Sequence, residues 1–183
     1  MPRFPLIAFV CFLPALCLSA ILPIQREVQK HYVDEGIFEG GSLTAANLAN
    51  IRLGIHTHEG FERWVVDFED PKTHVLGQSA PRFSLRYARE QIGMAPTGEE
   101  NLLLPARLLL SLRRIEHTTV TQERLDQLAA KSGLVKTVIL HPPIESGDRV
   151  VEFVLNRPAR FEAHQPKSRE GRLVLDLKPS TGE

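Results

Sequence analysis

Apolar and polar residues alternate along two stretches of this chain, and the alternation predicts β-strands. In the first stretch, Trp64, Val66 and Phe68 share one side, and Asp67 lies between them on the other. Successive side chains of a strand point to opposite faces, so this period of two indicates a strand with one buried face. Proline cannot donate to a β-ladder, so we expect the strand to end at Asp70-Pro71.

A second stretch nearer the C-terminus repeats the pattern. Its apolar positions are Val151, Phe153 and Leu155, and Pro158 follows them as the terminating proline. One further strand is expected on either side of each stretch. These flanking strands are Asn50–Ile55 and Pro81–Tyr87 in the first copy, and Gly133–Leu140 and Gly171–Leu177 in the second. Two copies of one supersecondary unit predict a pseudo-symmetric β domain.

One short helix is expected between the copies, over Gln122–Lys131. Thr121 is a suitable N-cap, and Gly133 is expected to take the C′ position with positive φ. The expected buried face consists of Leu125, Leu128 and Ala129. The apolar run before this helix, residues 102–116, has no clear period; Pro105 favours two strands, and a helix over Arg107–Glu116 stays open as the alternative.

The N-terminus has the features of a cleaved signal peptide over residues 1–20. Arg3 gives a basic start, Leu6–Leu18 is apolar, and Leu18-Ser19-Ala20 is a small-residue site with cleavage expected after about Ala20. An uncleaved anchor is disfavoured because the apolar run is shorter than the ~20 residues of a spanning helix. We therefore expect an exported, bacterial periplasmic protein with no membrane span after cleavage.

The expected domain organisation follows from these assignments. Residues 21–47 are interpreted as a leader or linker, 48–179 as one β domain and 180–183 as a tail. Both cysteines, Cys11 and Cys17, lie in the expected signal peptide. The mature chain would then contain no disulfide, no thiolate nucleophile and no cysteine metal site.

Charge restricts the classes of partner. The 183-residue chain has 22 Lys and Arg against 22 Asp and Glu, and 43% of its residues are hydrophobic. A packed core is therefore expected, and a zero net charge disfavours nucleic acid as a partner. Any binding of an anionic polymer would have to depend on a local cluster of charges.

The ordered motifs resemble the AMIN and AMIN-like domains. They are Ile51-Arg52-Leu53-Gly54, Arg63-Trp64-Val65-Val66-Asp67-Phe68, Arg149-Val150-Val151, Pro158 and Arg172-Leu173-Val174-Leu175-Asp176-Leu177. The resemblance covers roughly residues 48–179. It implies a mainly β sandwich of two small antiparallel sheets, related by an internal pseudo-two-fold. It also implies a localisation role at the cell envelope, through peptidoglycan or an envelope protein. The segment 93–132 is long for a plain AMIN domain, and no second domain follows.

No enzyme motif stands out, and no cofactor is expected. The chain has no G-x-S-x-G elbow, H-E-x-x-H pair or glycine-rich phosphate loop. His56, His58 and His141 could be metal ligands, but their place in expected turns favours ordinary polar residues, so we expect no metal site.

Arginine is the most promising residue type for binding. Arginines flank or occupy the expected strands at Arg52, Arg63, Arg82, Arg86, Arg149 and Arg172. A guanidinium can fork onto a carboxylate of a peptide stem, although strand arginines also pair with cross-strand acids. We take Arg63 and Arg149 as the candidate ligand-binding residues. The expected function is a non-catalytic, exported envelope-binding module that recognises peptidoglycan. The alternative is a protein-interaction module of a periplasmic secretion, pilus or division assembly.

Overall fold

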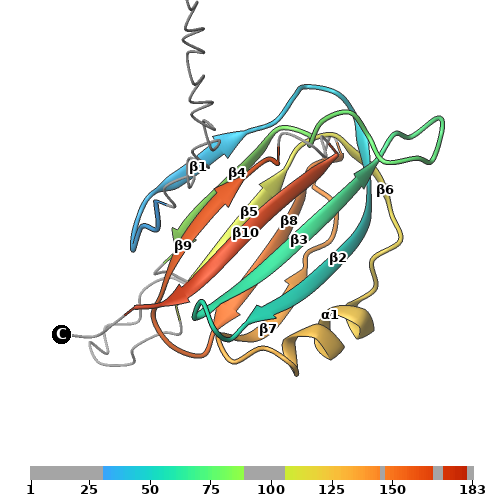
Figure 1. The fold of residues 1–183 in the computed structure, drawn as a ribbon. Coiled ribbons are helices and arrows are strands. Elements are labelled where there is room, and N and C mark those ends of the chain that lie inside the picture. The colour runs from blue at the N-terminus through green and yellow to red at the C-terminus, as the bar shows by residue number, and fades with distance from the viewer. Residues whose placement is uncertain (1–30, 89–105, 145–146, 167–170, 181–183) are drawn as a thin grey trace, which may run out of the picture.

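The computed structural model describes residues 31–88, 106–144, 147–166 and 171–180, and they form two five-stranded sheets packed face to face (Figure 1). The β3 sheet holds, in spatial order, β6 (Ile115–Thr118), β2 (Ala46–His56), β3 (Phe61–Glu69), β10 (Arg172–Pro179) and β9 (Ala159–His164). The β8 sheet holds β1 (Ile37–Gly40), β4 (Phe83–Ala88), β5 (Arg107–Leu112), β8 (Arg149–Leu155) and β7 (Val135–Leu140).

This architecture confirms the expected fold class, a mainly β sandwich with one short helix. Neighbouring strands pair antiparallel except β2 and β6, which pair in parallel at the edge of the β3 sheet. The strand interpretation of residues 107–112 is correct, because β5 pairs with β4 on one side and β8 on the other. The expected signal peptide and the first part of the apolar run, residues 102–105, lie outside the described residues.

The internal repeat has four strands in each unit rather than the three expected. Unit one is β2–β5 and unit two is β7–β10, and each unit contributes one hairpin to each sheet. The hairpins β2–β3 and β9–β10 form most of the β3 sheet, while β4–β5 and β7–β8 form most of the β8 sheet. The pseudo-two-fold therefore exchanges the two sheets.

Strand register gives the correspondence residue by residue. β10 pairs with β3 through Leu175 and Trp64, and β5 pairs with β8 through Leu110 and Val151. Arg172–Leu177 is thus the counterpart of Arg107–Leu112, whose sequence RLLLSL matches RLVLDL. The expected match of Arg172–Leu177 to Pro81–Tyr87 is wrong, because β4 corresponds instead to β9, a strand that the period alone did not reveal.

The core lies between the sheets and confirms the expected faces. All six alternating positions are buried, with 0–2% of their surface exposed: Trp64, Val66, Phe68, Val151, Phe153 and Leu155. Trp64 and Phe153 meet across the two layers edge to face, with 5.3 Å between ring centroids. Aromatic and aliphatic side chains from both sheets thus form one continuous core.

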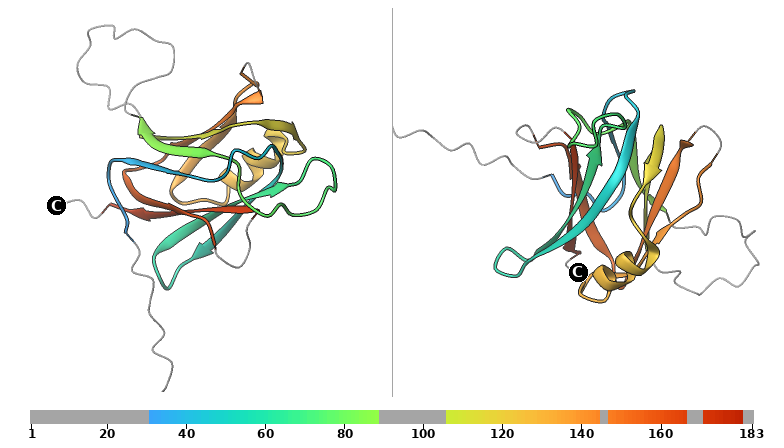
Figure 2. Two further views of the ribbon diagram at one scale, coloured as in Figure 1. Left: turned by 90° about the horizontal axis from the view of Figure 1, so that it is seen from above. Right: turned by 90° about the vertical axis from the view of Figure 1, so that its right-hand side faces the viewer.

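Helix α1 (Gln122–Ala129) lies at one end of the sandwich between the two layers (Figure 2). The Thr121 side chain accepts from the Arg124 N–H as the N-cap, and the face of Leu125, Leu128 and Ala129 is buried, as expected. The C-terminal expectation is wrong. The helix ends at Ala129, and the N–H of Gly133 donates instead to Glu62 at 2.6 Å. A strand carboxylate, rather than a glycine turn, fixes the chain after the helix.

The N-terminal boundary of the sandwich lies earlier than the sequence suggested. β1 pairs with β4, and Val33 bridges Phe161 at the edge of β9. Residues from Val33 onward therefore belong to the sheets rather than to a leader. At the far end of β3, the Lys72 and Thr73 N–H groups donate to the Asp70 carboxylate. These backbone bonds, chiefly that from Thr73, lower the pKa of Asp70 and fix the turn that ends the strand.

Gly171 allows a close approach that a side chain would prevent. A Cβ at this position would lie 2.5 Å from the Gly77 carbonyl oxygen and 2.8 Å from that of Phe68. We expect Gly171→Ala to lower the free energy of unfolding by about 1–3 kcal/mol, measured by chemical denaturation. Gly54→Ala is the control, because its Cβ would lie 3.5 Å from the nearest atom, His56 Nε2, an ordinary contact distance. Equal stability of the two variants would contradict this close packing.

Candidate anion-binding site

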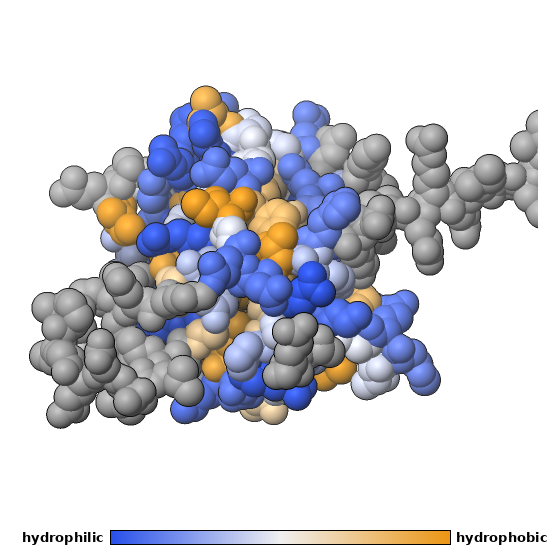
Figure 3. Space-filling model, turned by 90° about the vertical axis from the view of Figure 1, so that its left-hand side faces the viewer, coloured by the Kyte–Doolittle hydropathy of each residue, from blue (hydrophilic) through white to orange (hydrophobic). Residues whose placement is uncertain are grey.

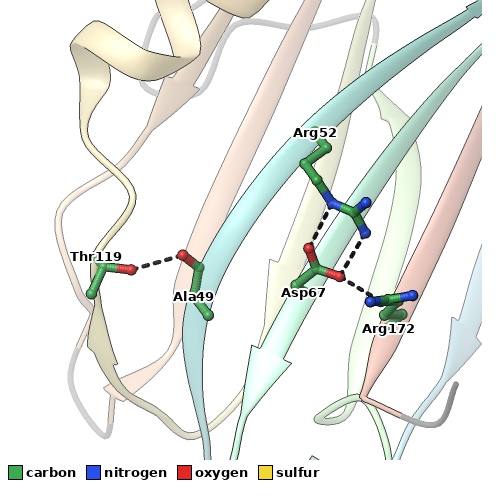
Figure 4. Close-up of polar contacts among 5 residues, drawn as sticks. All are labelled: Ala49, Arg52, Asp67, Thr119 and Arg172. Atoms are coloured by element: carbon green, nitrogen blue, oxygen red, sulfur yellow. Dashed lines mark hydrogen bonds and ion pairs between the residues drawn. The ribbon is translucent and has the colours of Figure 1, made fainter. Parts of the chain in front are cut away.

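The outer face of the β3 sheet carries arginines that are neutralised by carboxylates of the same face. The Asp67 carboxylate accepts hydrogen bonds from Arg52 Nε and Nη2 at 2.8 and 2.9 Å, and from Arg172 Nε at 2.7 Å (Figure 4). Asp67 is 9% exposed. A buried carboxylate requires such partners, so Arg52 and Arg172 have a structural role.

Arg63, one of the two predicted ligand residues, is held in the same way. Its Nε and Nη2 groups donate to the two Asp176 oxygens at 2.7 and 2.8 Å, and Asp176 is completely buried. Hydrogen bonding to Asp176 is the main cause that raises the pKa of Arg63. The guanidinium also lies 5.2 Å from the centre of the Phe61 ring, on which His56 stacks at 4.3 Å. The fork of Arg63 is therefore already occupied by a carboxylate.

The outward positions of the β8 sheet that correspond to Asp176, Glu162 and Arg63 carry no charge. By register, Ser111 stands in the place of Asp176, Ser84 in the place of Glu162, and Val150 in the place of Arg63. Among the described residues, one buried carboxylate remains on this face, Glu152, which contacts Arg107 and lies 2.8 Å from His141 Nε2. The repeat thus places an ion-paired row on one sheet and a row of serines on the other.

Arg82 and Arg113 flank this row of serines on the outer face, in a hollow of about 270 Å³ that Arg149 also lines. We call it the arginine hollow and define it by Arg82, Arg113, Arg149, Ser84 and Ser111. Arg149 shares the alternation of Val151, Phe153 and Leu155, so its side chain leaves β8 on the core-facing side. Arg82 precedes β4, Arg113 follows β5, and Arg149 opens β8, so adjacent strand ends bring them together. Among the described residues, none of the three guanidinium groups has an ion pair or a side-chain hydrogen bond, and the Arg149 Nε atom is buried without a partner.

The surroundings of the hollow are mixed in charge. Glu39 and Asp148 line it at opposite sides, and Asp148 accepts from the Arg114 N–H at 3.1 Å. The Arg114 side chain donates to the Leu43 carbonyl oxygen at 2.6 Å, in an adjoining hollow of about 180 Å³. The apolar part of the lining consists of Phe83, Leu112, Ile144 and Val150. This arrangement can receive an anionic group with a small apolar neighbour.

Other surfaces have less binding chemistry. On the side that carries β1 and β9, hydrophilic residues surround small, separate apolar patches (Figure 3). Within the described ranges, no group of three His, Cys, Asp or Glu residues could hold a metal ion. His141 lies against Glu152, and His56 against Phe61, so the structure gives both histidines contacts within the fold.

No family model matches this chain, and no curated protein matches it. In the described part of the chain, no helix has the length and apolar character needed to cross a membrane. The arginine hollow therefore depends on its own geometry for an interpretation.

The structure separates the two predicted ligand residues. Arg149 lines the arginine hollow from the core-facing row of β8, whereas Arg63 lies on the other sheet and is bound to Asp176. The sequence interpretation counted Arg82 among the arginines of the expected strands but did not single it out, and it did not consider Arg113. The available signal was the pair Arg113-Arg114 directly after an apolar strand.

The structural role of Arg63 can be tested through its partner. Asp176→Asn removes the charge that balances Arg63, whose side chain is only 31% exposed. We expect the free energy of unfolding to fall by about 2–3 kcal/mol, somewhat less than for a fully buried pair. Asp126→Asn on the exposed side of α1 is the control, with an expected change below about 0.5 kcal/mol. A loss no greater than that of the control would show that the pair does not stabilise the fold.

Proposed function

We propose that this protein is a non-catalytic, exported binding module of the bacterial cell envelope, which recognises peptidoglycan through carboxylates of its peptide stems. The observation that carries the proposal is the arginine hollow, where Arg82 and Arg113 lie on the outer face without ion pairs among the described residues. On the opposite sheet the arginines are neutralised from within the fold. The hollow is therefore where a carboxylate from outside finds a complementary site.

The physical basis is the bidentate geometry of arginine. A guanidinium presents parallel N–H donors that match the two oxygens of a carboxylate, and such charge-assisted bonds are roughly twice as strong as neutral ones. The chain as a whole has zero net charge. Long-range attraction to an anionic polymer is therefore weak, and local contacts in the hollow supply the affinity.

Two sequence features support the envelope setting. The N-terminal 20 residues have the pattern of a cleaved signal peptide, and the strand motifs resemble those of AMIN domains. The two-sheet sandwich and its repeat are compatible with that resemblance. The resemblance suggests the polymer, and the hollow supplies the chemistry that would bind it.

A sacculus pull-down tests this function. We expect the purified protein to sediment with isolated peptidoglycan well above an albumin control at low salt. Retention should fall at physiological salt, because exposed charges are screened over about 8 Å there. Absence of enrichment at both salt concentrations would contradict the proposal. Crosslinking in cells to one dominant envelope protein, without sacculus binding, would support the alternative of a protein-interaction module.

Paired variants locate the binding to the hollow. Arg82→Ala combined with Arg113→Ala removes two exposed guanidinium groups that make no side-chain hydrogen bond in the described structure. We expect sacculus retention to fall at least tenfold with an unchanged thermal midpoint, since charged hydrogen bonds each contribute about 1.5–3 kcal/mol. Arg124→Ala on α1 removes an exposed arginine elsewhere and should retain binding. Equal loss in both variants would indicate nonspecific charge attraction.

A further inference from the structure

We propose that the arginine hollow binds the free C-terminal carboxylate of a stem peptide whose last residue has a small apolar side chain. This inference rests on the proposed function and adds which part of the polymer is recognised. It distinguishes a chain end from the side-chain carboxylates and sugars of the same polymer. The argument uses the size, charge, hydroxyl groups and apolar lining of the hollow.

The size of the hollow fits an end group. Its volume of about 270 Å³ lies just below the roughly 300–1,000 Å³ of sites that enclose a whole small molecule. The hollow is formed where β4 and β8 begin and β5 ends, so it opens at the rim of the sheet. A terminal residue can enter from the rim while the rest of the peptide stays outside.

The charge of the lining fits a single negative charge. The residues that line the hollow include Arg82, Arg113 and Arg149 and two carboxylates, Glu39 and Asp148, so their formal net charge is +1. A single carboxylate balances this charge, whereas a phosphate dianion would leave an unbalanced negative charge. Glu39 also has no ion pair among the described residues, so it can receive a cationic group on the same ligand. The lining therefore favours a carboxylate on a peptide over inorganic or lipid phosphate.

The opposite sheet shows how this row accommodates a carboxylate. Asp176, the counterpart of Ser111, has both oxygens bound by an arginine fork. In the β8 sheet, Ser111 and Ser84 have short hydroxyl side chains without hydrogen bonds among the described residues, and they leave the space open. A carboxylate from a ligand can occupy that space, with arginine donors around it and hydroxyl donors beneath it.

The apolar part of the lining selects the residue that bears the carboxylate. Phe83, Leu112, Ile144 and Val150 line the hollow beside the arginines. Ile144 is 56% exposed and Val150 is half-buried, so these two side chains offer apolar surface to a ligand, whereas Phe83 and Leu112 belong to the core. A methyl side chain can pack against this surface, whereas a second charged side chain would lose its hydration there. Alanine at the end of a peptide combines the required carboxylate and methyl group.

Calorimetric titration of the purified protein tests the inference with synthetic tripeptides that end in D-alanine. We expect the free acid to bind at least tenfold more tightly than the same peptide with a C-terminal amide, because the amide cannot receive a charged arginine fork. Equal binding of acid and amide would overturn the inference. Tighter binding of inorganic phosphate than of the acid would overturn it as well.

Ser111→Asp introduces a carboxylate that would compete with the ligand from within the protein. It places a carboxylate where the other sheet carries Asp176, two residues before Arg113, which directly follows β5. We expect binding of the free acid to fall at least tenfold while the thermal midpoint is kept or raised. Ser111→Asn has nearly the same shape without the charge and should bind within about threefold of the original protein. Full binding by Ser111→Asp would overturn the assignment of the ligand to this row.

The outcomes separate this inference from the proposed function. Sacculus binding that depends on the arginines, without preference for free acid over amide, would overturn the chain-end inference and leave peptidoglycan recognition intact. Preference for the free acid without sacculus binding would overturn peptidoglycan as the partner. A preference for peptides ending in L-alanine over D-alanine would have the same consequence, since it indicates a protein C-terminus.

Discussion

Backbone pairing between the two repeat units holds this sandwich together. β3 pairs with β10 and β5 pairs with β8, and each of these pairs joins strands from different units. Without them, each sheet would be reduced to separate hairpins and edge strands, and isolated hairpins are at best marginally stable in water. The pairing also brings residues 105 positions apart, Asp67 and Arg172, into one ion pair. Such non-local contacts predict slow folding, because loop closure precedes the gain from packing.

The same pairing places chemically different rows at equivalent positions of the two outer faces. On the β3 sheet, acids and arginines neutralise each other, so the surface is stable and leaves few groups available. On the β8 sheet, serines replace the acids beside Arg82 and Arg113. Equivalent strands therefore support a structural face on one sheet and a receptive face on the other. The difference depends on a few side chains and requires no change of fold.

The sequence predicted the strands and their buried faces well where the period of two was sustained. Trp64, Val66 and Phe68 illustrate this, because alternation reports directly which side of a strand meets the core. It does not report which strand lies alongside. β9 and β1 are short and gave weak periods, and the partner of Arg172–Leu177 was therefore misassigned. The candidate site could not be identified for the same reason, because the neighbouring strands were unknown. Arg63 and Arg149 look alike in sequence, and only cross-strand neighbours distinguish a neutralised guanidinium from an open one.

Both repeat units contribute residues to the arginine hollow. Arg82, Ser84, Ser111 and Arg113 come from unit one, and Asp148 and Arg149 from unit two. Two identical units pairing as a homodimer would necessarily display the same residues on both outer faces. Joining the units in one chain removes that requirement. Each half can then mutate separately, so a duplicated gene can specialise one surface for recognition while the other secures the fold.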